Sequence, residues 1–382
     1  MVYLDNSATT KPCPQAVEAI TRALTEQWGN PSALYSFGID AARELRGARH
    51  QVAAAMGAEP ERVFFTSGGT EADNWAVMGA VKRLGKRGRH IVTTAMEHHA
   101  ILNCMQELEA QGFEVTYLKP DGMGRVSTED LKAALRGDTI LVSVMMVNNE
   151  VGSVMPIAQM AKLTHRLCPD AIFHTDAVQG FLKVPFQART LGADLISVSS
   201  HKIHGPKGAG ALYISPRLKS FPPLLLGGGQ ESGYRSGTEG TPAIFGFAAA
   251  AAGNATFQED HAREAALLTA LSERLSALPG VVLTGAHEAP HILSVSVPGV
   301  PTQNSINILQ DRGICVSAGS ACAKGHRSHV LTAMNVSPDI IDCTFRVSLS
   351  RLNTQEELDA LVEAIQQDIL PRVKTGRSKF HE

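Results

Sequence analysis

The chain has 382 residues, of which 44% are hydrophobic and 19% charged, a composition typical of globular proteins and not of disordered or fibrous ones. At roughly 150 residues per domain, this length predicts two or three domains. The 35 basic and 37 acidic side chains give a formal charge of -2, and aromatic residues make up only 5%. Both values argue against nucleic acid or an anionic membrane as the partner.

Cysteine usage and the chain start indicate a cytoplasmic protein. The six cysteines are scattered, with no C-x-x-C pair, so in a chain of this length they predict a reducing compartment and no disulfide framework. The first residues, MVYLDNSATTKPCP, lack the basic and apolar regions of a secretory signal. The most apolar stretch, residues 243–252, is too short to span a bilayer. The cysteines and histidines also lack metal-ligand spacing, so we expect no metal site.

Helical and strand-like segments alternate between residue 16 and about residue 214. Strands are expected over residues 62–66, 90–94, 114–118, 139–147, 171–175 and 194–199, and helices over 40–56, from 70 or 71, from 99, and over 128–135. The strands read as apolar runs without clean alternation, which is typical of strands buried on both faces. The pattern therefore predicts an α/β fold, with a mostly parallel sheet sandwiched by helices in a large domain.

The pattern changes near residue 225, where a long glycine-rich loop begins. A helical region follows over residues 242–278 with a possible break at Gly253, then strands over 281–283, 292–297 and 344–349 and a helix over 303–312. Thr354 and Glu357 fit a capping box at the start of a last helix. We expect a large domain over residues 13–257 and a smaller α+β domain formed by residues 1–12 with 258–382.

Two short segments of the large domain suggest ligand contacts, and each has an ordinary structural alternative. Residues 66–71, TSGGTE, lie between a strand and a helix start, where glycines and unpaired N–H groups suit a phosphate. The alternative is a simple capped turn. Asp176 stands at the carboxyl end of a buried strand, a common position for ligand contact. The alternative is an aspartate that caps a helix.

Lys202 and Cys322 are the candidate reactive side chains. Lys202 follows an apolar strand in SSHK and could form a Schiff base, although an isolated lysine is usually only solvated, and Lys207 is a rival. Cys322 lies among small residues and is followed by cationic side chains, which favour the thiolate, although it could be a surface thiol without a role. A phosphate turn, a buried aspartate, a lysine and a reactive cysteine together suggest pyridoxal phosphate.

A series of motifs in the same order as in a known family runs from residue 3 to residue 351. They are YLDNSATT, GNPSALYSFG, TSGGTEADN, MEHHA, VNNEVG, HTDAVQ, SSHKIHGPKGAGALY, GGGQESGYRSGTEGTP, SAGSAC and FRVSLSR. With these motifs the chain resembles the cysteine desulfurases, of the class V aminotransferase group with the type I fold of pyridoxal-phosphate enzymes. Ser200 departs from the glycine of many relatives.

The resemblance implies a role for each matching residue. Lys202 would bind pyridoxal 5′-phosphate covalently, and Asp176 would keep its ring nitrogen protonated. His98 would stack on the ring and act in catalysis by helping proton transfer, with His99 as the alternative. The other cofactor contacts would be Asn149 and Gln179 at the ring hydroxyl, and Gly69, Thr70, Ser199 and His201 at the phosphate. Thr238 would reach the phosphate of the partner subunit, which makes a homodimer with shared active sites.

The resemblance also implies the substrate and the reaction. Arg346 would bind the carboxylate of L-cysteine as a bidentate fork, with Asn30 nearby and Arg351 as another candidate. Sulfur would pass to Cys322 as a persulfide, leaving L-alanine. An acceptor protein docking near Cys322 would then take the sulfur for iron–sulfur assembly or thiolation. The segment after Cys322 is two residues shorter and more cationic than in long-loop desulfurases, which leaves the acceptor open.

Three alternatives to this reaction remain at the level of sequence. The nearest is a selenocysteine lyase or another pyridoxal-phosphate β-elimination enzyme. A second is a non-enzymatic thiol or metal protein, which the ligand spacing argues against. A third is a scaffold that has lost catalysis, which the presence of Lys202, Asp176 and Cys322 argues against.

Overall fold

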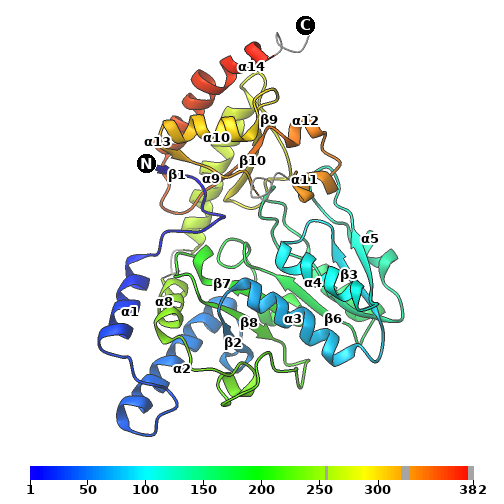
Figure 1. Cartoon of the computed structure of the whole chain (residues 1–382), viewed down its shortest axis with the longest axis vertical. Helices are drawn as coiled ribbons and strands as arrows, with labels where there is room; N and C mark the ends of the chain where they lie inside the picture. The colour runs from blue at the N-terminus through cyan, green and yellow to red at the C-terminus, as the bar shows by residue number, and fades with distance from the viewer. Residues whose placement is uncertain (254–256, 320–326, 377–382) are drawn as a thin grey trace.

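The computed structural model describes residues 1–253, 257–319 and 327–376. The chain forms a larger body around a seven-stranded sheet and a smaller body around two short sheets, with the smaller one above it in Figure 1. Each body has its own buried apolar core, and the larger body has one on each face of its sheet.

The large sheet is mostly parallel. Its strands, in spatial order, are β2 (Val63–Thr66), β8 (Gly210–Ile214), β7 (Leu195–Ser199), β6 (Ile172–Asp176), β5 (Thr139–Ser143), β3 (His90–Thr94) and β4 (Glu114–Leu118). Among these described strands, β8 alone runs antiparallel to its neighbours. The predicted fold class, a mostly parallel sheet between helices, is confirmed.

Helices cover both faces of this sheet. One face packs against α1 (Pro14–Thr25), α2 (Ser36–Met56), α5 (Thr128–Ala134), α6 (Ile157–Leu167), α7 (Ala188–Leu191) and α8 (Thr241–Ala252), and the other against α3 (Gly69–Leu84) and α4 (His99–Ala110). Phe64 packs edge-on against Trp75 of α3, whereas Phe65, next along β2, packs against Phe247 of α8. Every residue of the strands other than the edge strand β4 is buried, and most of these residues are apolar.

The smaller body combines the two ends of the chain. Its antiparallel sheet consists of β12 (Thr344–Ser348), β10 (Ile292–Ser296) and β9 (Val282–Leu283), and β1 (Val2–Tyr3) pairs with β11 (Ile314–Cys315). Its helices are α9 (Phe257–Ser276), α10 (Thr302–Asp311), α11 (His329–Ala333), α12 (Pro338–Ile341), α13 (Gln355–Ala364) and α14 (Leu370–Gly376). Leu4 is buried in the same core as these C-terminal elements. The domain boundaries themselves stay a prediction.

Two sequence expectations differ from the observed elements. The strand expected over 139–147 ends at Ser143, so the prediction is wrong for residues 144–147, which are apolar because they lie buried in the core beyond the sheet. Strand β8 was not predicted. The break at Gly253, where α8 ends, and the capping box of Thr354 with Glu357 are confirmed. No helix in the described part of the chain is long and apolar enough to cross a membrane.

Candidate functional site

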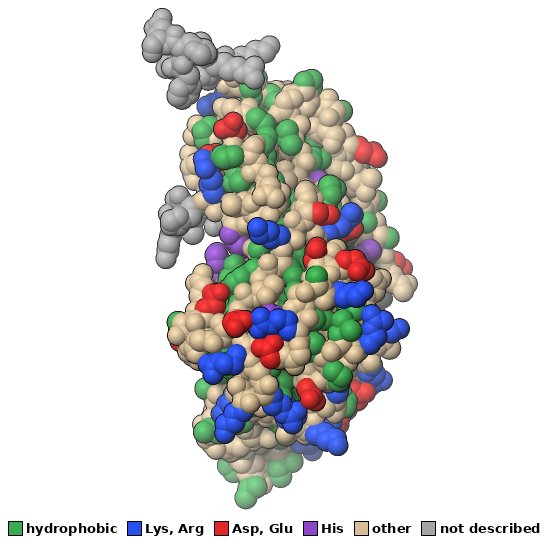
Figure 2. All heavy atoms as spheres, turned by 90° about the vertical axis from the view of Figure 1, so that its right-hand side faces the viewer, with side chains coloured by type: hydrophobic (Ala, Val, Ile, Leu, Met, Phe, Trp, Pro, Cys, Tyr) green, Lys and Arg blue, Asp and Glu red, His purple; other side chains and the backbone are tan. Residues whose placement is uncertain are grey.

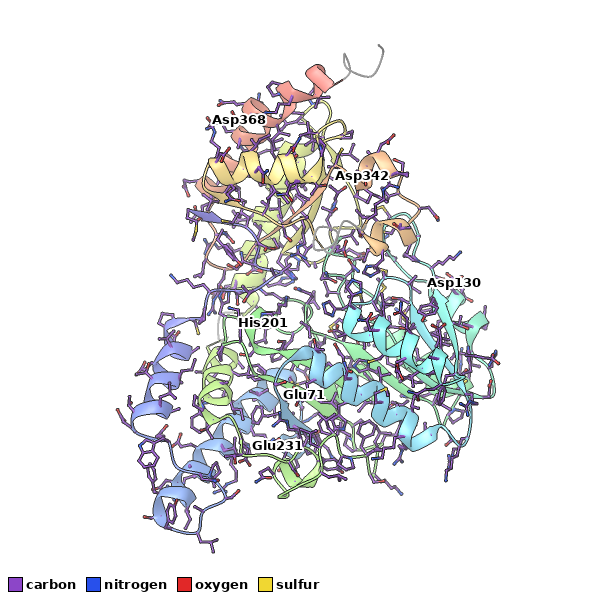
Figure 3. The ribbon with its side chains drawn as sticks, viewed as in Figure 1. Glu71, Asp130, His201, Glu231, Asp342 and Asp368 are labelled. Carbon is purple, nitrogen blue, oxygen red and sulfur yellow. The ribbon has the colours of Figure 1, made fainter. Side chains whose placement is uncertain are left out.

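A cavity of about 460 Å³ lies where the carboxyl ends of the parallel strands meet the smaller body. Its walls come from the segments that follow β2, β3, β5, β6 and β7, and from the smaller body through Ser317, Gly319, His329 and Arg346. His201, which lines it, is seen in Figure 3 at the junction of the two bodies. Parallel sheets place ligands at this edge because the loops that follow their strands converge there.

Most of the predicted site residues line this one cavity. They are Gly69, Thr70, His98, Asn149, Asp176, Gln179, Ser199, His201, Lys202 and Arg346. Cys322 lies outside the described residues. Neither Asn30 nor Thr238 lines the cavity of its own chain.

The two exceptions are both exposed residues of loops on the larger body. Asn30 lies between α1 and α2, where its Oδ1 accepts a 2.9 Å hydrogen bond from the amide of Ser32. Helix α1 carries this loop away from the smaller body, to the lower left of Figure 1, so one chain does not bring Asn30 near Arg346. Thr238 lies in the loop before α8.

One end of the cavity has the donors that a phosphate needs. Helix α3 begins at Gly69, so its N-terminal N–H groups and dipole favour an anion there. A Cβ atom at Gly69 would lie 2.7 Å from Cγ2 of Val178, so the close approach of these two segments requires glycine. The Ser199 hydroxyl is buried and has no hydrogen-bond partner among the described residues. A phosphate oxygen would satisfy it.

Asp176 supplies a buried carboxylate at the centre of the cavity wall. It is the last residue of β6, and its Oδ1 accepts a 2.8 Å hydrogen bond from the amide of Val178. Burial raises the pKa of Asp176 above its usual value. A buried carboxylate keeps its charge when a cation lies beside it. The protonated ring nitrogen of pyridoxal phosphate is such a cation, so the residues present fit this cofactor.

Lys202 has the properties of a reactive amine. Its Nζ donates hydrogen bonds to the carbonyl oxygens of Ser7 and Ala8, the latter at 2.9 Å. Burial, together with the nearby Arg346 guanidinium, lowers the pKa of Lys202 to about 8. Part of the amine is therefore unprotonated near neutral pH, as Schiff-base chemistry requires. The rival Lys207 is exposed and does not line the cavity.

Three histidines lie at the mouth of the cavity. His98 caps α4, and its Nδ1 accepts a 3.1 Å hydrogen bond from the amide of Ala100, so its proton resides on Nε2. The rings of His99 and His329 have centroids 4.9 Å apart, and burial, followed by the charge of His329, lowers the pKa of His99. Figure 2 shows histidine side chains near the boundary of the two bodies, on a face where acidic and basic groups are interspersed.

Arg346 forms the opposite end of the cavity. It is 6% exposed, and its Nη1 donates a 2.7 Å hydrogen bond to the carbonyl oxygen of Asn149. Its Nη2 donates to Oδ1 of Asp5 at 2.9 Å, and its Nε has no partner in the described structure. Arg351 instead lies 3.6 Å from Asp260, outside the cavity. Of the two arginines, Arg346 alone is available to a ligand in the cavity.

Sequence reasoning assigned no role to three buried acids at or next to this site, Asp73, Glu97 and Glu150. Asp73 lines the cavity, and burial, together with Asp176, raises its pKa. Its position one helical turn after Gly69 could have identified it. Glu97 accepts 2.8 Å hydrogen bonds from the Thr94 hydroxyl and the Met145 amide, and burial raises its pKa to about 8. No periodic signal marks Glu97. The described residues contain no acid, histidine or cysteine cluster that could hold a metal ion.

The aminotransferase class-V family matches this chain over residues 2–361. "Cysteine desulfurase IscS" of Methanosarcina thermophila is 41% identical over 369 residues, covering 95% of this chain and 91% of that protein. A solved "NIFS-LIKE PROTEIN" is 37% identical with a TM-score of 0.91, covering 96% of this chain and 99% of its own. "SspA in complex with cysteine" is 32% identical with a TM-score of 0.81, covering 93% and 100%. The chain therefore belongs to the cysteine desulfurase family, a group of pyridoxal-phosphate-dependent enzymes among the class V aminotransferases.

Proposed function

We propose that the chain converts L-cysteine to L-alanine and takes up the substrate sulfur on Cys322 as a persulfide. One observation carries the proposal: Lys202, Asp176 and Arg346 line the same cavity, and the chain lines it again at Gly319, shortly before Cys322 in the sequence. A guanidinium can bind the carboxylate of an amino acid, and a lysine amine can remove its α-proton. The buried carboxylate lies in the same cavity as both. A cysteine is needed to accept sulfur.

Pyridoxal 5′-phosphate would be held along the length of the cavity. Lys202 would bind it covalently, Asp176 would face its ring nitrogen, and His98 would cover its ring. The phosphate would be held by Gly69, Thr70, Ser199 and His201, and the ring hydroxyl by Asn149 and Gln179. When bound, the cofactor supplies an electron sink for the charge that develops at the substrate Cα. The unpartnered Ser199 hydroxyl and the buried Asp176 carboxylate support this arrangement.

Arg346 and Lys202 would then act on the substrate. The Arg346 guanidinium binds the substrate carboxylate, because it is buried in the cavity and its Nε has no partner in the described chain. Lys202 would hold the cofactor between turnovers, and its amine would be free while the substrate occupies the site. With a pKa of about 8 for Lys202, that amine can act as the base that removes the Cα proton near neutral pH.

Cys322 would complete the reaction as a nucleophile. Its thiolate attacks the substrate sulfur, so a sulfur–sulfur bond forms while the bond between Cβ and sulfur breaks. The electron pair of the broken bond goes to Cβ, which takes up one proton to become the methyl group of alanine. A thiol of an acceptor protein, docked near Cys322, then takes the outer sulfur for iron–sulfur assembly or thiolation.

A homodimer would complete each cavity. Large apolar side chains are exposed in the loop between α1 and α2, namely Trp28 (69%), Leu34 (93%) and Tyr35 (63%), and Leu226 is 84% exposed near the start of the loop that carries Thr238. Exposed apolar groups concentrated in this way mark an interaction surface. Thr238 would reach the phosphate of the partner subunit, and Asn30 would reach the partner's cavity.

A reducing, cytoplasmic location suits this chemistry. The five cysteines in the described part of the chain, Cys13, Cys104, Cys168, Cys315 and Cys343, are all free thiols. An acceptor thiol must be reduced to take sulfur from the persulfide, so the transfer would need a compartment that keeps thiols reduced.

The test is an absorbance spectrum with L-cysteine and a thiol reductant, with alanine and sulfide assayed together. We expect a near-visible cofactor band that shifts on addition of cysteine, and equal amounts of alanine and sulfide. Cys322→Ser should keep the band and lose sulfide release, whereas Cys315→Ser, a half-buried thiol outside the cavity, should behave like the parent. A shifted band without sulfide would indicate a lyase for another substrate, such as selenocysteine. Sulfide release by Cys322→Ser would refute the persulfide step.

A further inference from the structure

The loop that carries Thr238, residues 224–240, is closed by its own hydrogen bonds. The amide of Leu224 donates to the carbonyl oxygen of Tyr234 at 2.8 Å, and the amide of Ser236 donates to Leu225 at 3.1 Å. The amide of Gly237 donates to the side-chain oxygen of Gln230 at 3.1 Å. The residue directly before Thr238 is therefore held within the loop although Thr238 itself is exposed.

A buried ion pair fastens this loop to the body of the protein. Both Nη atoms of Arg49, on α2, donate 2.6 Å hydrogen bonds to the Glu231 carboxylate, and the amide of Phe65 on β2 donates to the same group at 2.8 Å. The Glu231 side chain is only 2% exposed. Glu231 and Ser232 both have positive φ angles, 48° and 57°, which non-glycine residues adopt only when the surroundings impose them. The pair thus holds a strained turn in place.

A second ion pair joins the same loop to the start of α3. Nε and Nη2 of Arg235 donate to the two oxygens of Glu71 at 2.8 and 3.3 Å. Glu71 is held from the other side by the Ser67 hydroxyl, which donates to it at 2.6 Å. Glu71 and Glu231 are both labelled in Figure 3, in the lower body. The loop is therefore anchored by two carboxylates, each of which is itself fixed by a further donor.

We propose that Arg235 and Glu231 are positioning residues that hold Thr238 in place to bind the cofactor phosphate of the partner subunit. The inference rests on the proposed shared active site. A threonine hydroxyl can strengthen phosphate binding across a subunit interface only if its loop is ordered before the phosphate arrives, because ordering the loop at that moment would consume the binding energy. The Arg49–Glu231 and Arg235–Glu71 ion pairs keep the loop ordered within each subunit. Their effect through Thr238 should therefore appear in the partner, in addition to any smaller effect that Arg235 has on its own chain through Glu71, next to Thr70.

Hybrid holo-dimers, in which only one subunit keeps Lys202, distinguish an effect on the partner's site from an effect on the chain's own site. One subunit carries Lys202→Ala, so cofactor absorbance reports only the site of the other subunit. With Arg235→Gln added to the Lys202→Ala subunit, cofactor should leave the intact site about tenfold faster, as for the loss of one hydrogen bond to a charged group. With Arg235→Gln placed instead in the subunit that keeps Lys202, release should be accelerated much less.

Matched variants keep the test specific. Arg235→Lys retains the cation and should restore slow release, and Arg125→Gln, which breaks an exposed ion pair with Glu288, should have no effect from either subunit. Glu231→Gln should reproduce the effect in the partner if the variant folds as a dimer. An effect confined to the substituted subunit, or no effect, would overturn the proposal.

Thr238→Val in the same hybrids shows which statement has failed. If Thr238→Val speeds release from the partner's site but Arg235→Gln does not, the positioning role is wrong and the shared site stands. If Thr238→Val leaves the partner's site unchanged, the shared site is wrong, and the positioning role falls with it.

Discussion

The Nζ atom of Lys202 lies 2.9 Å from the carbonyl oxygen of Ala8, and it donates to the neighbouring carbonyl of Ser7 as well. Two carbonyl oxygens of the segment after β1 thus hold the Lys202 amine in the cavity. The amide of Ser7 in turn donates a 2.8 Å hydrogen bond to the Ser348 hydroxyl, at the end of β12. The position of the amine therefore depends on the way the chain start joins the smaller body to the larger one.

The reactivity of Lys202 should depend on pH with a midpoint near 8. Burial and Arg346 lower its pKa from 10.5 to about 8, and only the free amine attacks the cofactor. The rate at which added pyridoxal phosphate attaches to cofactor-free protein should therefore rise with pH and level off above that value, as followed by absorbance. Lys202→Arg should not attach the cofactor. A midpoint close to 10 would contradict the assignment.

The lowered pKa of Lys202 also predicts how the free energy of unfolding depends on pH. Because the folded-state pKa of Lys202 lies below the unfolded value, the unfolded chain binds more protons between about pH 8 and 10.5. The free energy of unfolding of the cofactor-free protein should gain from this group as pH rises through that window. Denaturant titrations at several pH values should show the gain in the parent, and Lys202→Met should lack it.

Asp176→Asn should lower kcat while the protein stays folded. Removing the charge opposite the ring nitrogen should cost about a hundredfold or more, the size expected for a positioned acid–base group. Because burial raises the pKa of Asp176, the neutral amide should not lower the free energy of unfolding of the cofactor-free protein. Steady-state kinetics and denaturant unfolding would measure both. Asp170→Asn, whose side chain is 83% exposed, is the control, and an unchanged kcat in Asp176→Asn would contradict the prediction.

Gly69→Ala should weaken cofactor binding, whereas Gly47→Ala should stabilise the protein. A Cβ at Gly69 would lie 2.7 Å from Val178 Cγ2, so alanine should displace the cavity wall and weaken cofactor binding about tenfold or more, since overpacking costs about 1–3 kcal/mol. Gly47, inside α2, has nothing within 4 Å of the added atom, so alanine there should stabilise the protein by about 0.5–1 kcal/mol. Cofactor titration and thermal unfolding test the pair. Equal cofactor affinity in both variants would contradict the steric argument.

Asp194→Asn should destabilise the large sheet. The Asp194 carboxylate is buried and accepts hydrogen bonds from Arg217 at 2.6 and 2.7 Å and from His165 at 2.9 Å. Because the Arg217 side chain is 36% exposed and can reach water, the loss should cost about 1.5–3 kcal/mol, the range for a hydrogen bond to a charged group. Burial alone would raise the pKa of Asp194, but the hydrogen bonds from Arg217 and His165 outweigh it and lower the pKa below 3.8.

The effect of Asp194 should therefore depend on pH. Because its folded-state pKa is depressed, its stabilisation is present above pH 3.8 and is lost as pH falls through the lower folded value. The difference in the free energy of unfolding between the parent and Asp194→Asn should be largest near neutral pH and shrink in acid. Urea titrations across this range would measure it, and a difference independent of pH would show that the charge of Asp194 is not its cause.

The sequence predicts those helices and strands whose residues favour only one kind of local structure. Apolar runs bounded by glycine or capping residues identify most strands of the large sheet, and Thr354 with Glu357 identifies a helix start. Residues 144–147 mislead the same reasoning, because burial beyond the end of β5 produces the same apolar run as a strand. Strand β8 gives a weaker signal, because it follows a glycine-rich turn and itself begins with a glycine.

The sequence by itself determined the family of this protein and the residue types of its proposed site, namely a lysine, an aspartate, a glycine-containing turn and a cysteine in the order of that family, since those residue types limit what a site can do. Only the tertiary structure decided their environments. It buries Asp176, lowers the pKa of Lys202 to about 8, and joins Arg346 to Asp5. It also leaves Thr238 and Asn30 outside the cavity of their own chain. Burial and charge pairing arise between segments far apart in the sequence, so no local pattern can encode them.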